Sequence, residues 1–135
     1  MTPEEYISTQ ESDPASLLTA IHKLIIKEDK QVIAAVDFMM GNKMIIYSDR
    51  GAFKYALSST KKHLTLHALP MYCEPSIREK YLSLLSKAQF QKGCINFVNV
   101  EEMPPTIVAK FISDCSKIDV VAIRQKQLQK KKAKK

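Results

Sequence analysis

Two histidines on one predicted strand are the residues of this sequence best suited to chemistry. His63 and His67 flank the tripeptide Leu-Thr-Leu, and this alternation of polar and apolar residues is typical of a half-buried strand. The two imidazoles and Thr65 then share one face, and the two leucines share the other. The imidazoles lie roughly 13 Å apart along such a strand, so one metal ion cannot easily be held by both. We expect them to line one groove; the alternative is a pair of solvated or hydrogen-bonded histidines that bind nothing.

Two further polar residues lie on or beside a strand predicted over residues 94–98. Lys92 and Asn96 join the candidate face because the strand faces of small α+β domains offer concave surface. Cys94 is close to Lys92, but no histidine is placed beside its sulfur, so a buried core cysteine is expected rather than a nucleophile. The predicted ligand-binding residues are therefore His63, Thr65, His67, Lys92 and Asn96.

No enzyme motif accompanies these residues. The chain has three isolated glycines, no phosphate-binding loop, and no nucleophile-elbow or metalloprotease pattern. Its three cysteines show no C-x-x-C spacing, which argues against a disulfide framework or a zinc site. The acidic amino-terminal stretch has no apolar signal core, and no apolar run approaches the roughly 18 residues that span a membrane. These features predict a non-enzymatic domain in the reducing cytoplasm, with no catalytic residues and no membrane contact.

The positive charge belongs to one end of the chain. Of 21 basic residues, seven lie in residues 124–135, where there is no acid, so residues 1–123 hold 14 basic and 14 acidic side chains. We therefore expect one domain over residues 1–123 and a basic tail over 124–135. The tail is interpreted as a solvated terminus; the alternative is weak binding of nucleic acid through phosphate contacts.

Hydrophobic periodicity predicts the elements that position the candidate residues. Thr2, Pro3 and Glu5 have the spacing of a capping box and predict a short first helix, and a longer helix is predicted from Asp13-Pro14. Strands are predicted over residues 32–40, 43–48, 53–57, 63–69 and 94–98, and helices start at Pro75, Pro105 and after Asp119. This order favours an α+β fold, with an antiparallel sheet of about five strands and helices packed on one face.

The opposite face of that sheet is expected to be open. It should carry the candidate polar residues and, from the third strand, Lys54. The unidentified partner is a small ligand or a protein taken on this face. Two copies of the chain could also pair there through exposed apolar side chains such as Met39, Met40 or Tyr47.

Four segments of the chain are distinctive in combination: STKKHLTLH (residues 59–67) with Met71-Tyr72, FQKGCINF (90–97), EMP (102–104) and IDVVAIR (118–124). Together they resemble the YdhG-like family, a bacterial family described as a domain of unknown function. The resemblance runs from about Asp13 to Arg124 and implies a small α+β sheet with helices on one side. Some relatives are described as frataxin-like iron chaperones, so the resemblance implies an alternative function in binding iron, through Glu28, Asp29 and Asp37.

Overall fold

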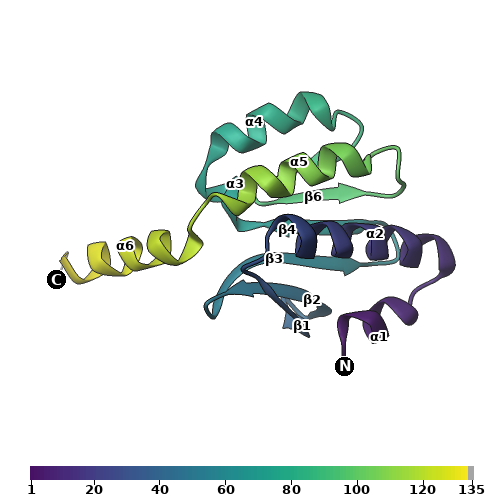
Figure 1. The fold of residues 1–135 in the computed structure, drawn as a ribbon, viewed down its shortest axis with the longest axis horizontal. Helices are drawn as coiled ribbons and strands as arrows, with labels where there is room; N and C mark the ends of the chain where they lie inside the picture. Colours follow the sequence, from purple (N-terminus) through teal and green to yellow (C-terminus); the bar gives the residue numbers. More distant parts are fainter. Residues whose placement is uncertain (134–135) are drawn as a thin grey trace.

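The computed structural model describes the backbone of residues 1–133 and the side chains of residues 1–129. This part of the chain is an α+β fold of helices and one antiparallel sheet, as predicted (Figure 1). Two short elements, α3 and β5, were not predicted. The elements are α1 (Pro3–Ser8), α2 (Ser12–Glu28), β1 (Ile33–Met39), β2 (Asn42–Asp49), β3 (Ala52–Ser59), β4 (Leu64–Ala68), α3 (Leu69–Cys73), α4 (Pro75–Leu84), β5 (Gln89–Phe90), β6 (Cys94–Phe97), α5 (Pro105–Ser116) and α6 (Val120–Ala133).

The sheet has six strands in the order β1-β2-β3-β4-β6-β5, and every neighbouring pair is antiparallel. Two-residue turns join its first three strands. Both turn residues have positive φ, at 53° and 80° for Met40-Gly41 and at 49° and 82° for Arg50-Gly51. Such turns match the right-handed twist of the strands they join, which explains why β1, β2 and β3 form one meander.

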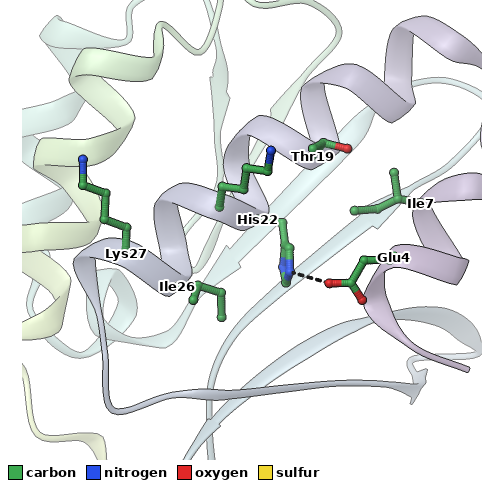
Figure 2. A pocket seen from close by; sticks show the side chains of 7 residues that line it. Glu4, Ile7, Thr19, His22, Ile26 and Lys27 are labelled. Atoms are coloured by element: carbon green, nitrogen blue, oxygen red, sulfur yellow. Dashed lines mark ion pairs between the residues drawn. The ribbon is translucent and has the colours of Figure 1, made fainter.

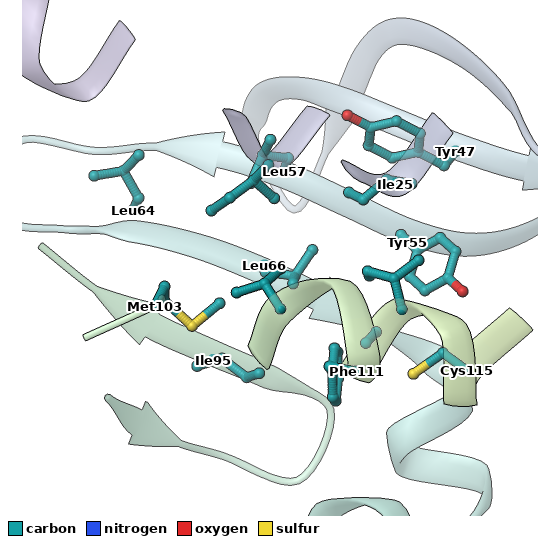
Figure 3. Packing of buried hydrophobic residues seen from close by; sticks show 14 of the residues in the cluster. Ile25, Tyr47, Tyr55, Leu57, Leu64, Leu66, Ile95, Met103, Phe111 and Cys115 are labelled. Atoms are coloured by element: carbon teal, nitrogen blue, oxygen red, sulfur yellow. The ribbon is translucent and has the colours of Figure 1, made fainter. Parts of the chain in front are cut away.

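The helices gather on one face of the sheet, where α2 and α5 lie side by side (Figure 1). Leu64 and Leu66 of β4 point toward this layer and pack in one core with Phe111 of α5 (Figure 3). Leu66 is completely buried and Leu64 is 4% exposed. The strand therefore buries its leucines beneath the helices, as the alternation of β4 predicts, and turns Thr65 and His67 to the opposite face.

A register shift in β3 changes the direction in which one side chain, that of Lys54, was expected to point. Tyr55 lies opposite Tyr47 and Phe53 lies opposite Ser48, so Lys54 has no partner of its own on β2. In such a bulge two consecutive side chains can point to the same side of the sheet. Lys54 accordingly lies beneath the helices and is 1% exposed, and the prediction that it belongs to the open face is wrong.

The amino-terminal helix is closed by the capping box that the sequence predicts. The Glu5 backbone N–H donates to Thr2 Oγ1, and the Thr2 backbone N–H donates to Glu5 Oε1, both at 3.1 Å. Tyr6 then packs into the core at 4% exposure, and its hydroxyl accepts from the Ser59 backbone N–H at 3.1 Å. These contacts fix α1 beside α2, over the β1 end of the sheet.

The carboxy-terminal helix α6 starts at a polar cap and then leaves the body of the domain (Figure 1). The Ala122 backbone N–H donates to Asp119 Oδ1 at 3.0 Å, so the cap that the sequence predicts is formed. The lysine side chains of the predicted tail from residue 130 onward lie outside the described residues. Within residues 1–133, no helix is long and apolar enough to cross a membrane.

Candidate functional site

A hydrogen-bonded row on the open face of the sheet joins three of the predicted residues. Thr65 of β4 lies opposite Asn96 of β6, and its hydroxyl donates to Asn96 Oδ1 at 2.8 Å. The same hydroxyl oxygen lies 3.2 Å from His63 Nδ1. Because a hydroxyl has one proton and that proton goes to Asn96, the imidazole must be the donor, with its hydrogen on Nδ1. His63 then offers Nε2 as an acceptor, and Asn96 offers its amide N–H groups as donors.

A cavity opens beside this row, and we call it the His63 cavity. Its volume is about 340 Å³, within the range of small-molecule sites. Lys62 and Lys87 lie at the border of the cavity. The one acid there, Glu102, accepts a hydrogen bond from the Val98 backbone N–H at 2.7 Å. The border therefore carries more positive than negative charge. The cavity is lined by Lys62, His63, Lys87, Gln89, Asn96, Phe97, Val98 and Glu102.

Of the five predicted residues, His63 and Asn96 line this cavity, and Thr65 orients them without lining it. His67 lies one row along the same face, opposite Ala56 and Cys94, and burial lowers the pKa of its imidazole. Lys92 is an exposed residue of the turn before β6. The structure thus brings His63, Thr65 and Asn96 together and leaves His67 and Lys92 apart.

Six of the eight lining residues were not among the predicted site residues, and three of these six, Gln89, Lys62 and Lys87, supply hydrogen-bond donors or positive charge. Gln89 reaches it because β5 adds a two-residue strand beyond β6, with Gln89 opposite Asn96. A signal for that strand was present, since Gln89-Phe90 and Cys94 flank a short turn that contains a glycine. Lys62 and Lys87 are loop residues, and no periodic pattern predicted their approach.

A second hollow, of about 350 Å³, lies between α1 and α2 (Figure 2). Its wall contains His22, whose Nδ1 is 2.7 Å from the Tyr47 hydroxyl and whose Nε2 is 3.9 Å from Glu4 Oε1. Burial lowers the pKa of His22 against the opposing effect of Glu4, and it holds the pKa of Tyr47 far above its usual range. A neutral imidazole therefore accepts from the Tyr47 hydroxyl and ties α2 to β2.

Tyr47 is completely buried in this contact. Its predicted contribution to a surface that pairs two copies is therefore wrong. The physical reason is that β2 turns Tyr47 toward the helices, opposite Tyr55 in the register of the sheet.

One of the acids that the resemblance assigns to iron, Asp29, takes part in a buried ion pair. Asp29 Oδ2 accepts from Lys54 Nζ and from the Tyr55 hydroxyl, each at 2.8 Å, and Asp29 is 2% exposed. An ammonium group already neutralises this carboxylate, so it does not fit a cation site.

The predicted metal set is corrected accordingly. Glu28, Asp29 and Asp37 do not come together, and no group of three or more His, Cys, Asp or Glu side chains in the described part of the chain is placed to hold a metal ion. Hard iron ions favour clustered oxygen ligands, and the described residues do not form such a cluster. The iron-binding alternative has no support from the structure.

The cysteines are held as thiols. Burial raises the pKa of Cys94, and its Sγ donates to Gln91 Oε1 at 2.9 Å. Burial also raises the pKa of Cys115, which is completely enclosed in the core (Figure 3). Neither sulfur is a thiolate near neutral pH, so neither is placed to act as a nucleophile.

Comparison with known proteins does not extend this description. Scans against protein-family models, curated proteins and solved structures find no match to the chain. The YdhG-like resemblance therefore stays a prediction from the quoted segments, and any function must be inferred from the geometry of the chain itself.

Proposed function

We propose that this chain is a non-enzymatic binding module that takes a small anionic ligand in the His63 cavity, on the open face of its sheet. One observation supports this most directly. Thr65 bonds to both His63 and Asn96, and so orients an imidazole and an amide along the border of one cavity. A polar row that is held by its own hydrogen bonds loses little conformational freedom when a ligand binds.

The charge of the border favours an anion. Lys62 and Lys87 supply ammonium groups, and Asn96 and Gln89 supply amide donors. The carboxylate of Glu102 is engaged by a backbone N–H, which reduces its repulsion of a bound anion. A carboxylate or phosphate group of the ligand is the chemistry that these lysine and amide donors recognise, whereas His63 Nε2, as an acceptor, binds a hydroxyl group of the same ligand.

The lining supports binding rather than catalysis. Its described residues include no serine, cysteine or tyrosine for His63 to activate. The Thr65 hydroxyl is within reach of the imidazole, but its proton is directed to Asn96 and the residue is 7% exposed. A nucleophile needs both a base to receive its proton and access to the substrate, and Thr65 has neither.

We also propose a cytoplasmic location and membership of the YdhG-like family. Three free cysteines fit a reducing compartment, where thiols stay reduced. The family proposal rests on the combination of the FQKGCINF and STKKHLTLH segments.

Isothermal titration calorimetry with phosphate monoesters, small dicarboxylates and neutral sugars tests the proposed function. We expect at least one anion to bind and the sugars not to bind. Replacing Lys62 and Lys87 together by alanine should weaken that binding about tenfold or more, because two charge-assisted contacts with the anion are lost. Lys43→Ala, at an exposed lysine on β2, is the matched control and should bind like the wild type. Equal binding by the double variant, or binding of neutral sugars alone, would contradict the proposal.

A further inference from the structure

The two edges of the sheet differ in length. β1 forms one edge with seven residues, whereas β5 forms the other with two. Natural proteins usually protect a long edge with proline, lysine or a bulge, because unpaired strands associate. β1 contains no proline or lysine, its one charged residue is Asp37, and its pairing with β2 is regular over its whole length, with no bulge.

The same edge carries the most exposed large apolar side chains of the described residues. Ile33 is 74% exposed, Met40 is 70% exposed and Phe38 is 66% exposed. All three lie in β1 or in the turn that follows it. Large apolar side chains that stay exposed along an unpaired strand are typical of an interaction surface.

The outward backbone groups of β1 can be assigned from its turn. The pair that flanks a two-residue turn is hydrogen-bonded, and hydrogen-bonded pairs then alternate along the strand. Met39 flanks the turn, so Ala34, Val36 and Phe38 direct their N–H and C=O groups away from β2. The Phe38 N–H indeed donates to the Asp37 side chain, at 2.7 Å, rather than to β2. Ala34 and Val36 therefore offer an open ladder to another strand.

We propose that β1 pairs antiparallel with β1 of a second copy of this chain, about a two-fold axis at Val36. In this register Val36 lies opposite itself. Ile33 lies opposite the second copy's Met39 on one face, and Phe38 lies opposite the second copy's Ala34 on the other. The apolar side chains thus cover one another.

The charge of Asp37 favours a two-fold axis at Val36 over one at the neighbouring residue, Ala35. With the axis at Val36, Asp37 lies opposite the second copy's Ala35. An axis at Ala35 would instead place Asp37 opposite Ile33, so that an acid would face an apolar side chain. Because each chain has one long edge and β5 is too short to replace it, the assembly closes as a dimer.

Asp37 also limits the strength of this pairing. Its carboxylate occupies the Phe38 N–H, and the two Asp37 side chains become diagonal neighbours about 7–8 Å apart across the pair. Removing the carboxylate therefore releases a backbone donor and relieves the repulsion between like charges.

Sedimentation velocity on the full chain, from low micromolar to submillimolar concentration, tests the pairing. We expect a monomer–dimer equilibrium in the wild type. Ile33→Lys should weaken the dimer about tenfold or more, because it puts a charge in the apolar contact, and Asp37→Ala should tighten it. Val100→Lys, at a residue that is 51% exposed outside the sheet, is the matched control and should leave the equilibrium unchanged.

Three results would overturn the proposal. One is a wild-type chain that stays monomeric at submillimolar concentration. Another is assembly beyond a dimer, which would mean that the contact does not close. The third is equal weakening by Ile33→Lys and Val100→Lys, which would place the contact elsewhere.

Discussion

One side-chain motif occurs twice in this fold, once buried and once at the surface. In each copy a lysine and the tyrosine that follows it donate to a single carboxylate. Lys54-Tyr55 donates to Asp29 at 2.8 Å from both groups. Lys80-Tyr81 donates to Asp114 at 2.8 Å and 2.6 Å. The contact geometry is nearly the same, so a difference between the two copies reports on burial.

We predict that Lys54→Met destabilises the protein far more than Lys80→Met does. The Lys54 and Asp29 side chains are 1% and 2% exposed, so the first variant leaves a charged carboxylate in the interior. Such a loss costs about 3–5 kcal/mol, a large part of the roughly 5–15 kcal/mol that stabilises a domain. Lys80 and Asp114 are 56% and 27% exposed, and water screens their pair, so Lys80→Met should cost about 0–1 kcal/mol.

Urea unfolding followed by far-ultraviolet circular dichroism measures both free energies. In a thermal scan, the loss of Lys54 should lower the Tm by about 10–20 °C. The double variant Lys54→Met with Asp29→Asn should recover most of the loss, because the amide is neutral and still accepts from Tyr55. Equal losses for Lys54→Met and Lys80→Met, or a double variant no more stable than the single one, would refute the account of the buried pair.

Three further predictions concern single residues. In the folded state, burial lowers the pKa of His67 below its ordinary value of 6.5, so the unfolded state binds more protons. The free energy of unfolding should therefore fall as the pH drops below 6.5. Urea unfolding across that pH range should show a flatter dependence for His67→Gln. Gly41 has a φ of +80° and open space around it, so a side chain at this position is strained only through the backbone conformation. In the same assay, Gly41→Ala should lower the free energy of unfolding by about 1 kcal/mol, and Gly41→Asn should lower it less. Equal losses for the two variants would contradict this explanation. In the native protein iodoacetamide should label the half-buried Cys73 well before the enclosed Cys115, which peptide mass spectrometry would show; faster labelling of Cys115 would contradict its burial.

Alternation made β4 predictable from the sequence. Its two leucines are separated by Thr65, and each leucine contributes to the core, so a shift of one residue would have moved both to the open face. The capping box at Thr2 was also predicted correctly, for a different reason: it depends only on two residues three apart in the sequence.

The bulge at Lys54 could not be predicted in this way. Alternation assigns Lys54 to the face opposite Tyr55, but the extra residue in β3 turns both side chains toward Asp29. A lysine and an aspartate that are 25 residues apart in sequence give no local signal that they pair. Tyr47 was misplaced for a related reason, since its burial depends on which face of β2 the helices cover.

The candidate site was predictable only in its central part. His63, Thr65 and Asn96 lie on strands whose faces follow from periodicity. Lys62 and Lys87 lie in loops, and their positions depend on the tertiary structure. A short strand such as β5 has too few residues for a period to show.

Nitrogen-15 NMR of the histidine and asparagine side chains can show whether an anion binds in the His63 cavity. During a titration with the anion that binds most tightly in calorimetry, we expect saturable shifts of His63 Nε2 and of the Asn96 side-chain amide, with the signals of His22 unchanged. Thr65→Val, which removes the hydroxyl that orients both groups, should weaken the response. Shifts confined to the helical face, with His63 and Asn96 unmoved, would contradict the claim that the open face of the sheet binds the ligand.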